Sequence, residues 1–299
     1  MNERGKSVDK THLSIDAAEQ RGFIHRDYIA HCLRWSHVMK YLGRGHFYRY
    51  AKILDIGCGK EIPLAKTMYS SKFVPLEGSY TGIDVNQLEV PAMFRTGKFP
   101  LKLIGGTDVC RHDFGTDRFN VITCFEVLEH VEPAHSLDIL KTIEYLLNKN
   151  EDSVAFISTP IYDPNVGAAA NHVNEMSFEA VAYLLYRAGL LVRNVYGTFA
   201  SQRDIEPQIQ ELGAAVWQTY TSMKAYYDSN YLATVFAPLF PQQSRNALWE
   251  VTTIKQCPRP HPLGMAWTGQ NFFDPDHSSS TEWVKFIQRE SSMEREENA

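Results

Sequence analysis

The chain has 299 residues, of which 44% are hydrophobic, and a formal net charge of −5. This length and apolar content suffice for one large domain with a buried core. The net negative charge provides no general electrostatic attraction to nucleic acid, although the first 50 residues carry a local excess of lysine and arginine.

Cysteine usage and hydropathy bear on the compartment. The five cysteines are Cys32, Cys58, Cys110, Cys124 and Cys257, an odd number without any C-x-x-C pair. This pattern predicts neither a disulfide framework nor a zinc ribbon, and it fits a reducing, cytoplasmic setting. The N-terminus leads into no apolar signal segment, and no run of 18 apolar residues occurs. We therefore expect neither secretion nor a membrane partner.

The first part of the chain shows a regular alternation of elements. Residues 1–50 are predicted to form an N-terminal helical segment, because apolar side chains recur at steps of three and four from about Ser14 to Leu42. Predicted strands then lie at 51–56, 80–85, 101–104, 119–124, 153–158 and 191–198, and predicted helices at 61–70, 88–95, 134–148 and 177–188. Such alternation predicts a Rossmann-like, doubly wound α/β sheet, mostly parallel, with helices on both faces.

The C-terminal part is less regular. Residues 247–254 form a last predicted strand, which would pair with the strand at 191–198. The stretch between them, 199–245, is predicted to be an insertion that starts helical and becomes rich in Tyr, Trp and Phe. It could close over the strand ends as a lid, pack as an added layer, or form a homodimer interface. The main domain would then span 51–255, followed by a polar tail at 256–299.

A glycine-rich turn directly follows the first predicted strand. It reads D-I-G-C-G from Asp55 to Gly59, and Asp84 ends the second strand 25 residues later. Without a Cβ, Gly57 and Gly59 let the backbone bend sharply and approach a ligand closely. An acid at the tip of the next strand can accept hydrogen bonds from ribose hydroxyls. We therefore predict a nucleoside site, in which Asp55 contacts the ligand, accepts backbone N–H groups of its own turn, or does both.

The same turn and acid resemble the first two motifs of the class I S-adenosylmethionine (SAM)-dependent methyltransferases. The resemblance covers about residues 50–199 and returns at 246–255. It implies SAM as the cofactor, with Gly57 and Gly59 beneath its methionine end and Asp84 on its ribose. It also implies that the last strand of the sheet runs antiparallel to the others.

An acid after the third strand usually hydrogen-bonds the adenine amine in that family. Asp108, eleven residues before Phe119, fits the family spacing better, and Asp113, six residues before it, is the alternative. Either carboxyl could instead cap its own turn. Both residues are therefore candidates for the cofactor site.

The segment after the fourth strand carries candidate catalytic groups. It reads E-V-L-E-H-V from Glu126 to Val131. On a helical turn Glu126, Glu129 and His130 would share one face beyond the strand end. The resemblance implies that Glu126 lies near SAM. His130 could be a structural histidine or a general base, since an unperturbed imidazole pKa near 6.5 suits proton transfer at neutral pH.

A second histidine, His172, follows an S-T-P segment at 158–160. E-x-x-E-H, S-T-P and a later histidine together resemble the small-RNA 3′-terminal 2′-O-methyltransferases and the ubiquinone-pathway O-methyltransferases. In the RNA enzymes, two glutamates and two histidines bind a divalent cation that gathers the vicinal hydroxyls of a ribose. Carried over, the ligands of a Mg²⁺ or Mn²⁺ ion would be Glu126, Glu129, His130 and His172, whose donor types suit such ions. His130 and His172 are thus the catalytic candidates.

We therefore expect a SAM-dependent methyltransferase that acts on a hydroxyl of a small molecule, sugar or nucleotide. The residues after the fourth strand are F-E-V-L, not N-P-P-Y or D-P-P-Y, and no Pro-Cys nucleophile follows that strand. This argues against methylation of DNA amines and of cytosine C5. One alternative is a metal-dependent RNA ribose 2′-O-methyltransferase, with nucleic acid as the less favoured partner. The other is an inactive SAM-fold scaffold or regulatory subunit, against which the intact Gly57, Gly59 and Asp84 argue.

Overall fold

The computed structural model describes residues 26–150, 152–163 and 165–253. Predictions for residues 1–25 and for the polar tail lie outside this described part. Within it, one sheet contains β1 (Lys52–Ile56), β2 (Ser79–Asp84), β3 (Leu101–Gly105), β4 (Val121–Phe125), β5 (Val154–Pro160), β6 (Leu190–Phe199) and β7 (Asn246–Thr253). The strand order is β3-β2-β1-β4-β5-β7-β6. Only β7 runs antiparallel to its neighbours among these strands, which confirms the predicted Rossmann-like sheet.

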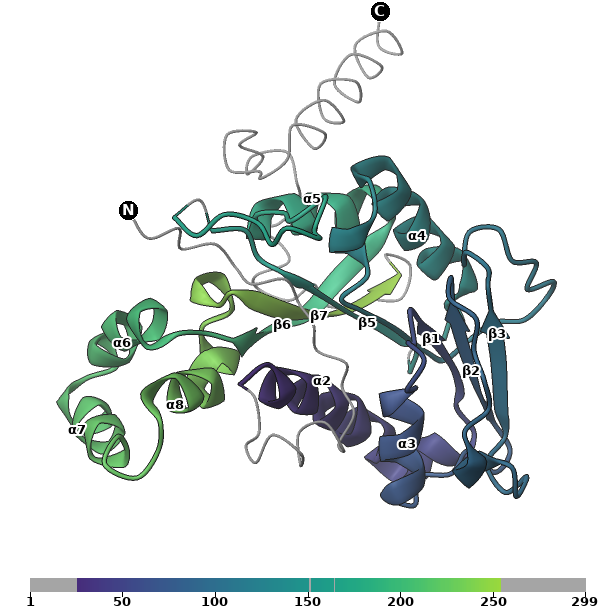
Figure 1. Ribbon diagram of the computed structural model, residues 1–299, viewed down its shortest axis with the longest axis horizontal. Coiled ribbons are helices and arrows are strands. Elements are labelled where there is room, and N and C mark those ends of the chain that lie inside the picture. Colours follow the sequence, from purple (N-terminus) through teal and green to yellow (C-terminus); the bar gives the residue numbers. More distant parts are fainter. Residues whose placement is uncertain (1–25, 151, 164, 254–299) are drawn as a thin grey trace, which may run out of the picture.

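Helices cover both faces of the sheet (Figure 1). On one face lie α4 (Pro133–Leu146) and α5 (Phe178–Arg187), and on the other lie α2 (Arg26–Leu42) and α3 (Pro63–Ser70). Successive side chains of a strand point to opposite faces. Accordingly, Leu54 and Ile56 of β1 join the core under α4 and α5, and Ile53 joins the core under α2 and α3. The apolar run of β1 therefore reflects burial on both faces.

The predicted helix at 88–95 is wrong. Only a short 3-10 turn forms there, at Ala92–Phe94, directly after Pro91. Proline has no backbone N–H for a helical hydrogen bond, and it disfavours helical backbone at the residue before it. The chain from Gln87 to Val90 therefore stays irregular.

Three helices between β6 and β7 confirm the helical insertion. They are α6 (Gln202–Glu211), α7 (Ala214–Met223) and α8 (Ser229–Phe236), and they form a lobe at one end of the sheet (Figure 1). Ile205, Ile209 and Tyr220 are central to a separate small core in this lobe. Leu212, three residues after Ile209, is exposed because α6 ends at the residue before it. Within the described ranges, every helix is too short or too polar to cross a membrane.

The insertion meets the sheet at Gly197 of β6. A Cβ built on Gly197 would collide with Oγ of Ser244 and with the backbone carbonyl of Ala237. Both of these residues lie in the chain that returns from α8 to β7. The close contact of two backbones at this point therefore requires a residue without a side chain.

Substitution Gly197→Ala tests this contact. We expect it to lower the free energy of unfolding by about 1–3 kcal/mol, because the added methyl group must push two packed segments apart. Thermal or urea unfolding followed by circular dichroism measures the change. Gly43→Ala is the control, since Gly43 has an ordinary φ of −67° and its added Cβ would meet nothing closer than 3.3 Å. Equal effects of the two substitutions would contradict the prediction.

Candidate active site

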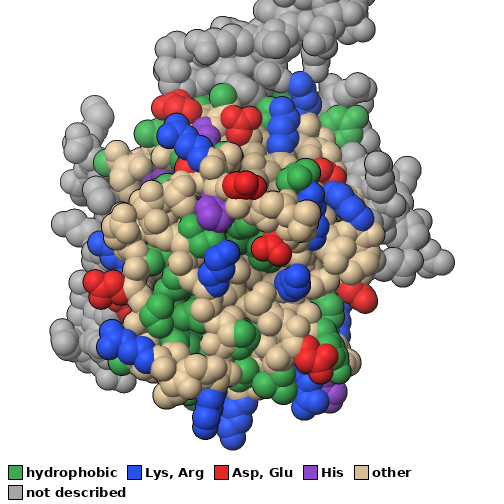
Figure 2. Space-filling model, turned by 90° about the vertical axis from the view of Figure 1, so that its right-hand side faces the viewer, with side chains coloured by type: hydrophobic (Ala, Val, Ile, Leu, Met, Phe, Trp, Pro, Cys, Tyr) green, Lys and Arg blue, Asp and Glu red, His purple; other side chains and the backbone are tan. Residues whose placement is uncertain are grey.

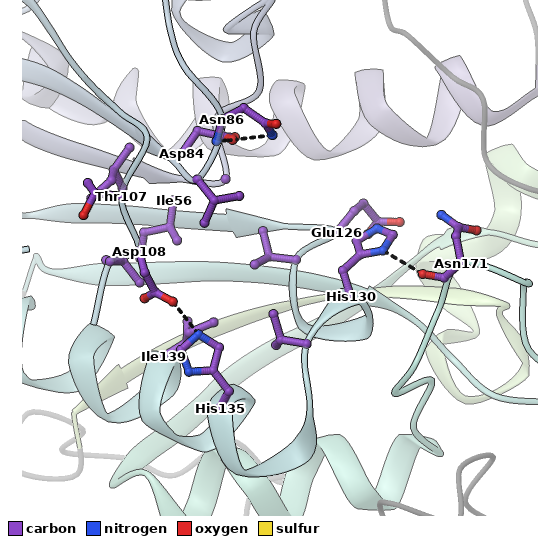
Figure 3. Close-up of a pocket in the computed structure, with 16 residues that line it drawn as sticks. Ile56, Asp84, Asn86, Thr107, Asp108, Glu126, His130, His135, Ile139 and Asn171 are labelled. Carbon is purple, nitrogen blue, oxygen red and sulfur yellow. Dashed lines mark hydrogen bonds and ion pairs between the residues drawn. The ribbon is translucent and has the colours of Figure 1, made fainter. Parts of the chain in front are cut away.

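A cavity of about 660 Å³ lies at the carboxyl ends of β1, β2 and β4. Its volume is typical of small-molecule sites. The chain order of the strands reverses at β1, which has β2 on one side and β4 on the other, and ligands of open α/β sheets bind at such a point. Figure 3 shows three polar groups in its lining: Asp84 with Asn86, Asp108 with His135, and His130 with Asn171.

The turn after β1 reaches the cavity through Gly57. Gly57 and Gly59 both have a φ of +66°, in the left-handed region that favours glycine. A Cβ on Gly57 would collide with Cγ2 of Val127 in the chain that leaves β4. Val127 can therefore pack this closely on the turn because Gly57 has no side chain.

Asp84, the last residue of β2, contacts this turn. Its Oδ2 accepts a hydrogen bond from the backbone N–H of Gly59 at 2.9 Å. Its Oδ1 accepts from the backbone N–H of Asn86 at 2.8 Å and from the Asn86 side-chain amide at 2.9 Å. A carboxylate offers about four lone-pair positions, so these three donors orient Asp84 and leave capacity for a ribose hydroxyl.

Asp55 lies beneath the turn and is not among the described residues that line the cavity. Its Oδ1 accepts a hydrogen bond from the Thr123 hydroxyl at 2.6 Å, and its Oδ2 accepts from the Tyr80 hydroxyl. Asp55 thus accepts hydrogen bonds from two hydroxyls of neighbouring strands, in place of the expected bonds from backbone N–H groups of its own turn. Burial raises the pKa of Asp55 to about 6, although both hydroxyl bonds favour the ionised form.

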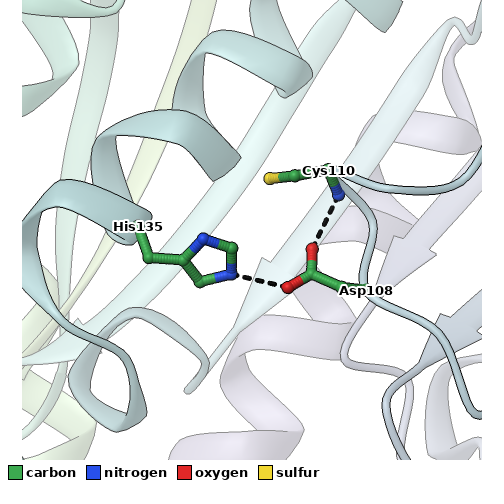
Figure 4. Close-up of side chains that lie close together, drawn as sticks. All are labelled: Asp108, Cys110 and His135. Atoms are coloured by element: carbon green, nitrogen blue, oxygen red, sulfur yellow. Dashed lines mark hydrogen bonds and ion pairs between the residues drawn. The ribbon is translucent and has the colours of Figure 1, made fainter.

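The two candidates for the adenine contact lie in different places. Asp108 lines the cavity; its Oδ1 accepts from the Cys110 backbone N–H at 2.7 Å, and its Oδ2 lies 2.7 Å from Nε2 of His135 (Figure 4). Asp113 accepts from the backbone N–H of Gly115 at 2.7 Å within its own exposed turn. The geometry therefore favours Asp108 as the cofactor residue.

His135 is a cavity residue that no sequence motif indicated. It lies in the first turn of α4 and points toward Asp108 from across the cavity (Figures 3 and 4). Single ligand atoms of Asp108, Cys110 and His135 lie within 4.8 Å of one another. Burial raises the pKa of the Cys110 thiol to about 11, which keeps it protonated at neutral pH. The described contacts of this group are contacts among protein residues, such as those of Asp108 with Cys110 and His135.

Glu126 does not share a face with Glu129 and His130, so this prediction is wrong. Its φ of +55° breaks the chain direction after β4, and only Leu128–His130 forms a 3-10 turn. The Glu126 Oε1 accepts from the Ser158 hydroxyl at 2.8 Å and lies 3.2 Å from Nη1 of Arg34. Its Oε2 accepts from the Asn246 amide at 2.8 Å.

Arg34 and Asn246 were also missed by sequence reasoning. Arg34 is 1% exposed on α2, and Asn246 is the first residue of β7. Arg34 falls within the helical pattern predicted for the N-terminal segment, which gave no sign of its burial, and a buried arginine requires a counterion. The pattern contained no information on which carboxylate supplies that charge.

The remaining three predicted metal ligands do meet. Atoms of Glu129, His130 and His172 lie within 4.8 Å of one another, and Glu126 is outside this group. The His130 and His172 rings are nearly perpendicular, with centroids 4.8 Å apart. Burial, with a smaller effect of the Glu126 charge, raises the pKa of Glu129 well above its usual range.

Both histidines have Nδ1 engaged by the protein. Nδ1 of His130 lies 3.2 Å from the carbonyl oxygen of Asn171, and Nδ1 of His172 lies 2.6 Å from Oε1 of the buried Glu175. An acceptor at Nδ1 places the proton there in a neutral imidazole, so that Nε2 carries the lone pair. Each ring is therefore prepared to take a proton or to bind a cation through Nε2. Glu175 was not a sequence candidate, although it stands three residues after His172.

The strand order with antiparallel β7, the glycine turn and Asp84 are the features expected of a class I SAM-dependent methyltransferase. A family model described as "Methyltransferase domain" matches residues 26–219. The chain belongs to that family, and by family it is a SAM-dependent methyltransferase.

Individual relatives are more distant. The chain is 35% identical over 122 residues to the ubiquinone biosynthesis O-methyltransferase of Glaesserella parasuis. The aligned region covers 36% of this chain and 44% of that relative, so the chain spans less than half of the relative's length. The O-methyltransferase of a trans-AT PKS multienzyme of Brevibacillus brevis, in complex with S-adenosyl-L-homocysteine (SAH), is similar at 16% identity and TM-score 0.47 over 89% of this chain and 85% of that chain. Magnesium protoporphyrin IX methyltransferase of Synechocystis with bound SAH is similar at 10% identity and TM-score 0.47, over 76% and 84%.

The raised pKa of Asp55 predicts a pH-dependent stability. Because the folded pKa of about 6 exceeds the ordinary 3.8, folding is favoured while Asp55 is protonated. This contribution is complete below about pH 4 and is lost as the pH rises through about 6. We expect the free energy of unfolding of the wild type, relative to that of Asp55→Asn, to fall by roughly 2–3 kcal/mol as the pH rises from about 4 to about 7. Urea unfolding at several pH values measures it, and a constant difference would contradict it.

Proposed function

We propose that this methyltransferase transfers the methyl group of SAM to a hydroxyl oxygen of a small molecule, sugar or nucleotide. The observation that supports an oxygen acceptor is the pair His130 and His172 beside the cavity, each with Nδ1 engaged. A hydroxyl is a weak nucleophile until its proton is removed, and an imidazole Nε2 is a suitable base at neutral pH. His130, which lines the cavity, is the group that we propose for this step.

The other lining residues would orient the cofactor. Asp84 would hold the ribose, Asp108 the adenine amine, and Glu126 the positively charged methionine end. SAM supplies an electrophilic methyl group on its sulfonium. Nε2 of His130 would take the hydroxyl proton as the acceptor oxygen bonds to that methyl group, and SAH would leave with the electron pair of the C–S bond on its sulfur. Alignment of the acceptor oxygen opposite that bond contributes most to the rate.

The charge distribution supports a small acceptor over a nucleic acid. On the face beyond β3, Figure 2 shows lysine and arginine side chains interspersed with acidic ones. The polar lining of the cavity includes the carboxylates Asp84, Asp108 and Glu126. Such a lining favours a cationic cofactor and would repel a polyphosphate chain.

Calorimetric titration with SAH tests the cofactor site. We expect the wild type to bind SAH and Asp84→Asn to bind it at least tenfold more weakly, because the loss of charge disturbs both the Gly59 contact and the ribose acceptor. Asp113→Asn is the matched control, since that aspartate only accepts a bond in an exposed turn, and its affinity should stay within twofold. A wild-type protein that does not bind SAH would overturn the proposed function.

A second candidate is ribose 2′-O-methylation of RNA with a divalent cation. The close approach of Glu129, His130 and His172 favours it. The buried Glu129 carboxyl has no described arginine or lysine within salt-bridge distance, and a cation would supply that positive charge. A bound Mg²⁺ or Mn²⁺ would also lower the pKa of a coordinated hydroxyl.

Titration of the full chain with Mn²⁺ decides between the two candidates. Under the metal candidate, Mn²⁺ binds, Glu129→Gln abolishes that binding with little change in SAH affinity, and EDTA removes methyl transfer. Under the first proposal, methyl transfer to a small hydroxyl acceptor persists in EDTA. His130→Ala then lowers kcat at least a hundredfold while SAH affinity stays within threefold, because a general base contributes typically about 10²–10⁴-fold.

A further inference from the structure

The side chain of Asn246 joins three parts of the molecule next to the cavity. Its Oδ1 accepts a hydrogen bond from Nη1 of Arg34 at 3.1 Å and another from the Thr198 hydroxyl at 2.7 Å. Its Nδ2 donates to Oε2 of Glu126 at 2.8 Å. Asn246 is 6% exposed, so water has little access to replace a lost partner. A single amide thus connects α2, β6 and the segment that leaves β4.

Two of these residues lie at the neck of the helical insertion. Thr198 is near the end of β6, directly before the insertion, and Asn246 begins β7, directly after it. Their hydrogen bond therefore closes the neck between the two chain ends of α6–α8. The amide end of Asn246 reaches from this neck to Glu126, which lines the cavity.

Glu126 depends on such support. Its φ of +55° is an uncommon conformation for a residue with a side chain, and conformations of this kind persist only where the surroundings hold them. The carboxylate is held by donors from three elements: Arg34 from α2, Ser158 from β5 and Asn246 from β7. Arg34 balances the charge, while the hydrogen bonds of Ser158 and Asn246 set the orientation.

We propose that Asn246 is a positioning residue for the cofactor. It holds the Glu126 carboxylate at the cavity wall through Nδ2, and through Oδ1 it ties that carboxylate to α2 and to the neck of the insertion. Displacement of the neck would therefore move Glu126, so that the insertion and the cofactor end of the cavity are coupled. This inference rests on the proposed contact of Glu126 with SAM.

Substitution Asn246→Asp tests the inference in the full-length protein. It keeps the shape of the side chain but places an acceptor and a negative charge against Oε2 of Glu126. We expect the dissociation constant of SAH to rise at least tenfold. Asn194→Asp is the matched control, because Asn194 donates to Oε2 of Glu250 at 3.2 Å across the same strand pair, and neither residue lines the cavity. Its SAH affinity should stay within twofold.

A double-mutant cycle shows whether Asn246 acts through Glu126. In Glu126→Gln, the Gln amide can donate to the carboxylate of Asn246→Asp, which restores the bond with donor and acceptor exchanged. We expect Glu126→Gln alone to weaken SAH binding at least fivefold, and Asn246→Asp to cost at most threefold more in that background. Should circular dichroism show that Asn246→Asp does not fold, Asn246→Ala replaces it in the same cycle. We expect Asn246→Ala to weaken SAH binding three- to tenfold when residue 126 is Glu and less than twofold when it is Gln.

The outcomes separate the inference from the proposed function. Wild-type protein that does not bind SAH would overturn the proposed function. If SAH binds, any of three results overturns the inference. The first is an unchanged SAH affinity in Glu126→Gln, and the second is a loss of SAH affinity in Asn246→Asp no larger than that in Asn194→Asp. The third is an equal loss of SAH affinity on substitution of Asn246 whether residue 126 is Glu or Gln. The expected pattern supports both.

Discussion

The contact between Gly57 and the side chain of Val127 is the constraint on which the site depends. The turn after β1 passes so close to Val127 that a Cβ on Gly57 would collide with it. Glu126, the residue before Val127, has a left-handed conformation with a φ of +55°. The same turn presents the N–H of Gly59 to Asp84. The glycine turn, Asp84 and the segment after β4 therefore meet where Gly57 has no room for a side chain.

The site contains several carboxyl groups, which differ in their hydrogen bonding, charge pairing and burial. Asp84 and Asp108 are held at the cavity by hydrogen bonds and remain partly available. Glu126 is charge-paired with Arg34. Asp55 and Glu129 lie beneath the surface, where burial raises the pKa of both. An acidic cavity of this kind complements a cofactor that carries a sulfonium and an ammonium group, and low dielectric around it strengthens that attraction.

Local patterns succeeded where one segment decides the outcome and failed where competing constraints acted. Alternating apolar segments predicted the strands, but the helix at 88–95 was wrong because Pro91 removes a donor and restricts Val90. The E-x-x-E-H spacing assumed a helical turn, whereas the positive φ of Glu126 directs its side chain to Arg34 and Asn246. A spacing of three and four residues places side chains on one face only if the backbone between them is helical, and the sequence does not show that it is not helical at Glu126.

The sequence by itself determined the α/β class, the glycine turn, Asp84 and the helical insertion, because these depend on periodicity and on short spacings. Only the tertiary structure decided that Asp108 rather than Asp113 faces the cavity, and that Asn246 contacts Glu126. The latter pair is 120 residues apart, and Arg34 and Asn246 are 212 apart. Such contacts follow from the order and register of strands in the sheet, which no local pattern of residues encodes.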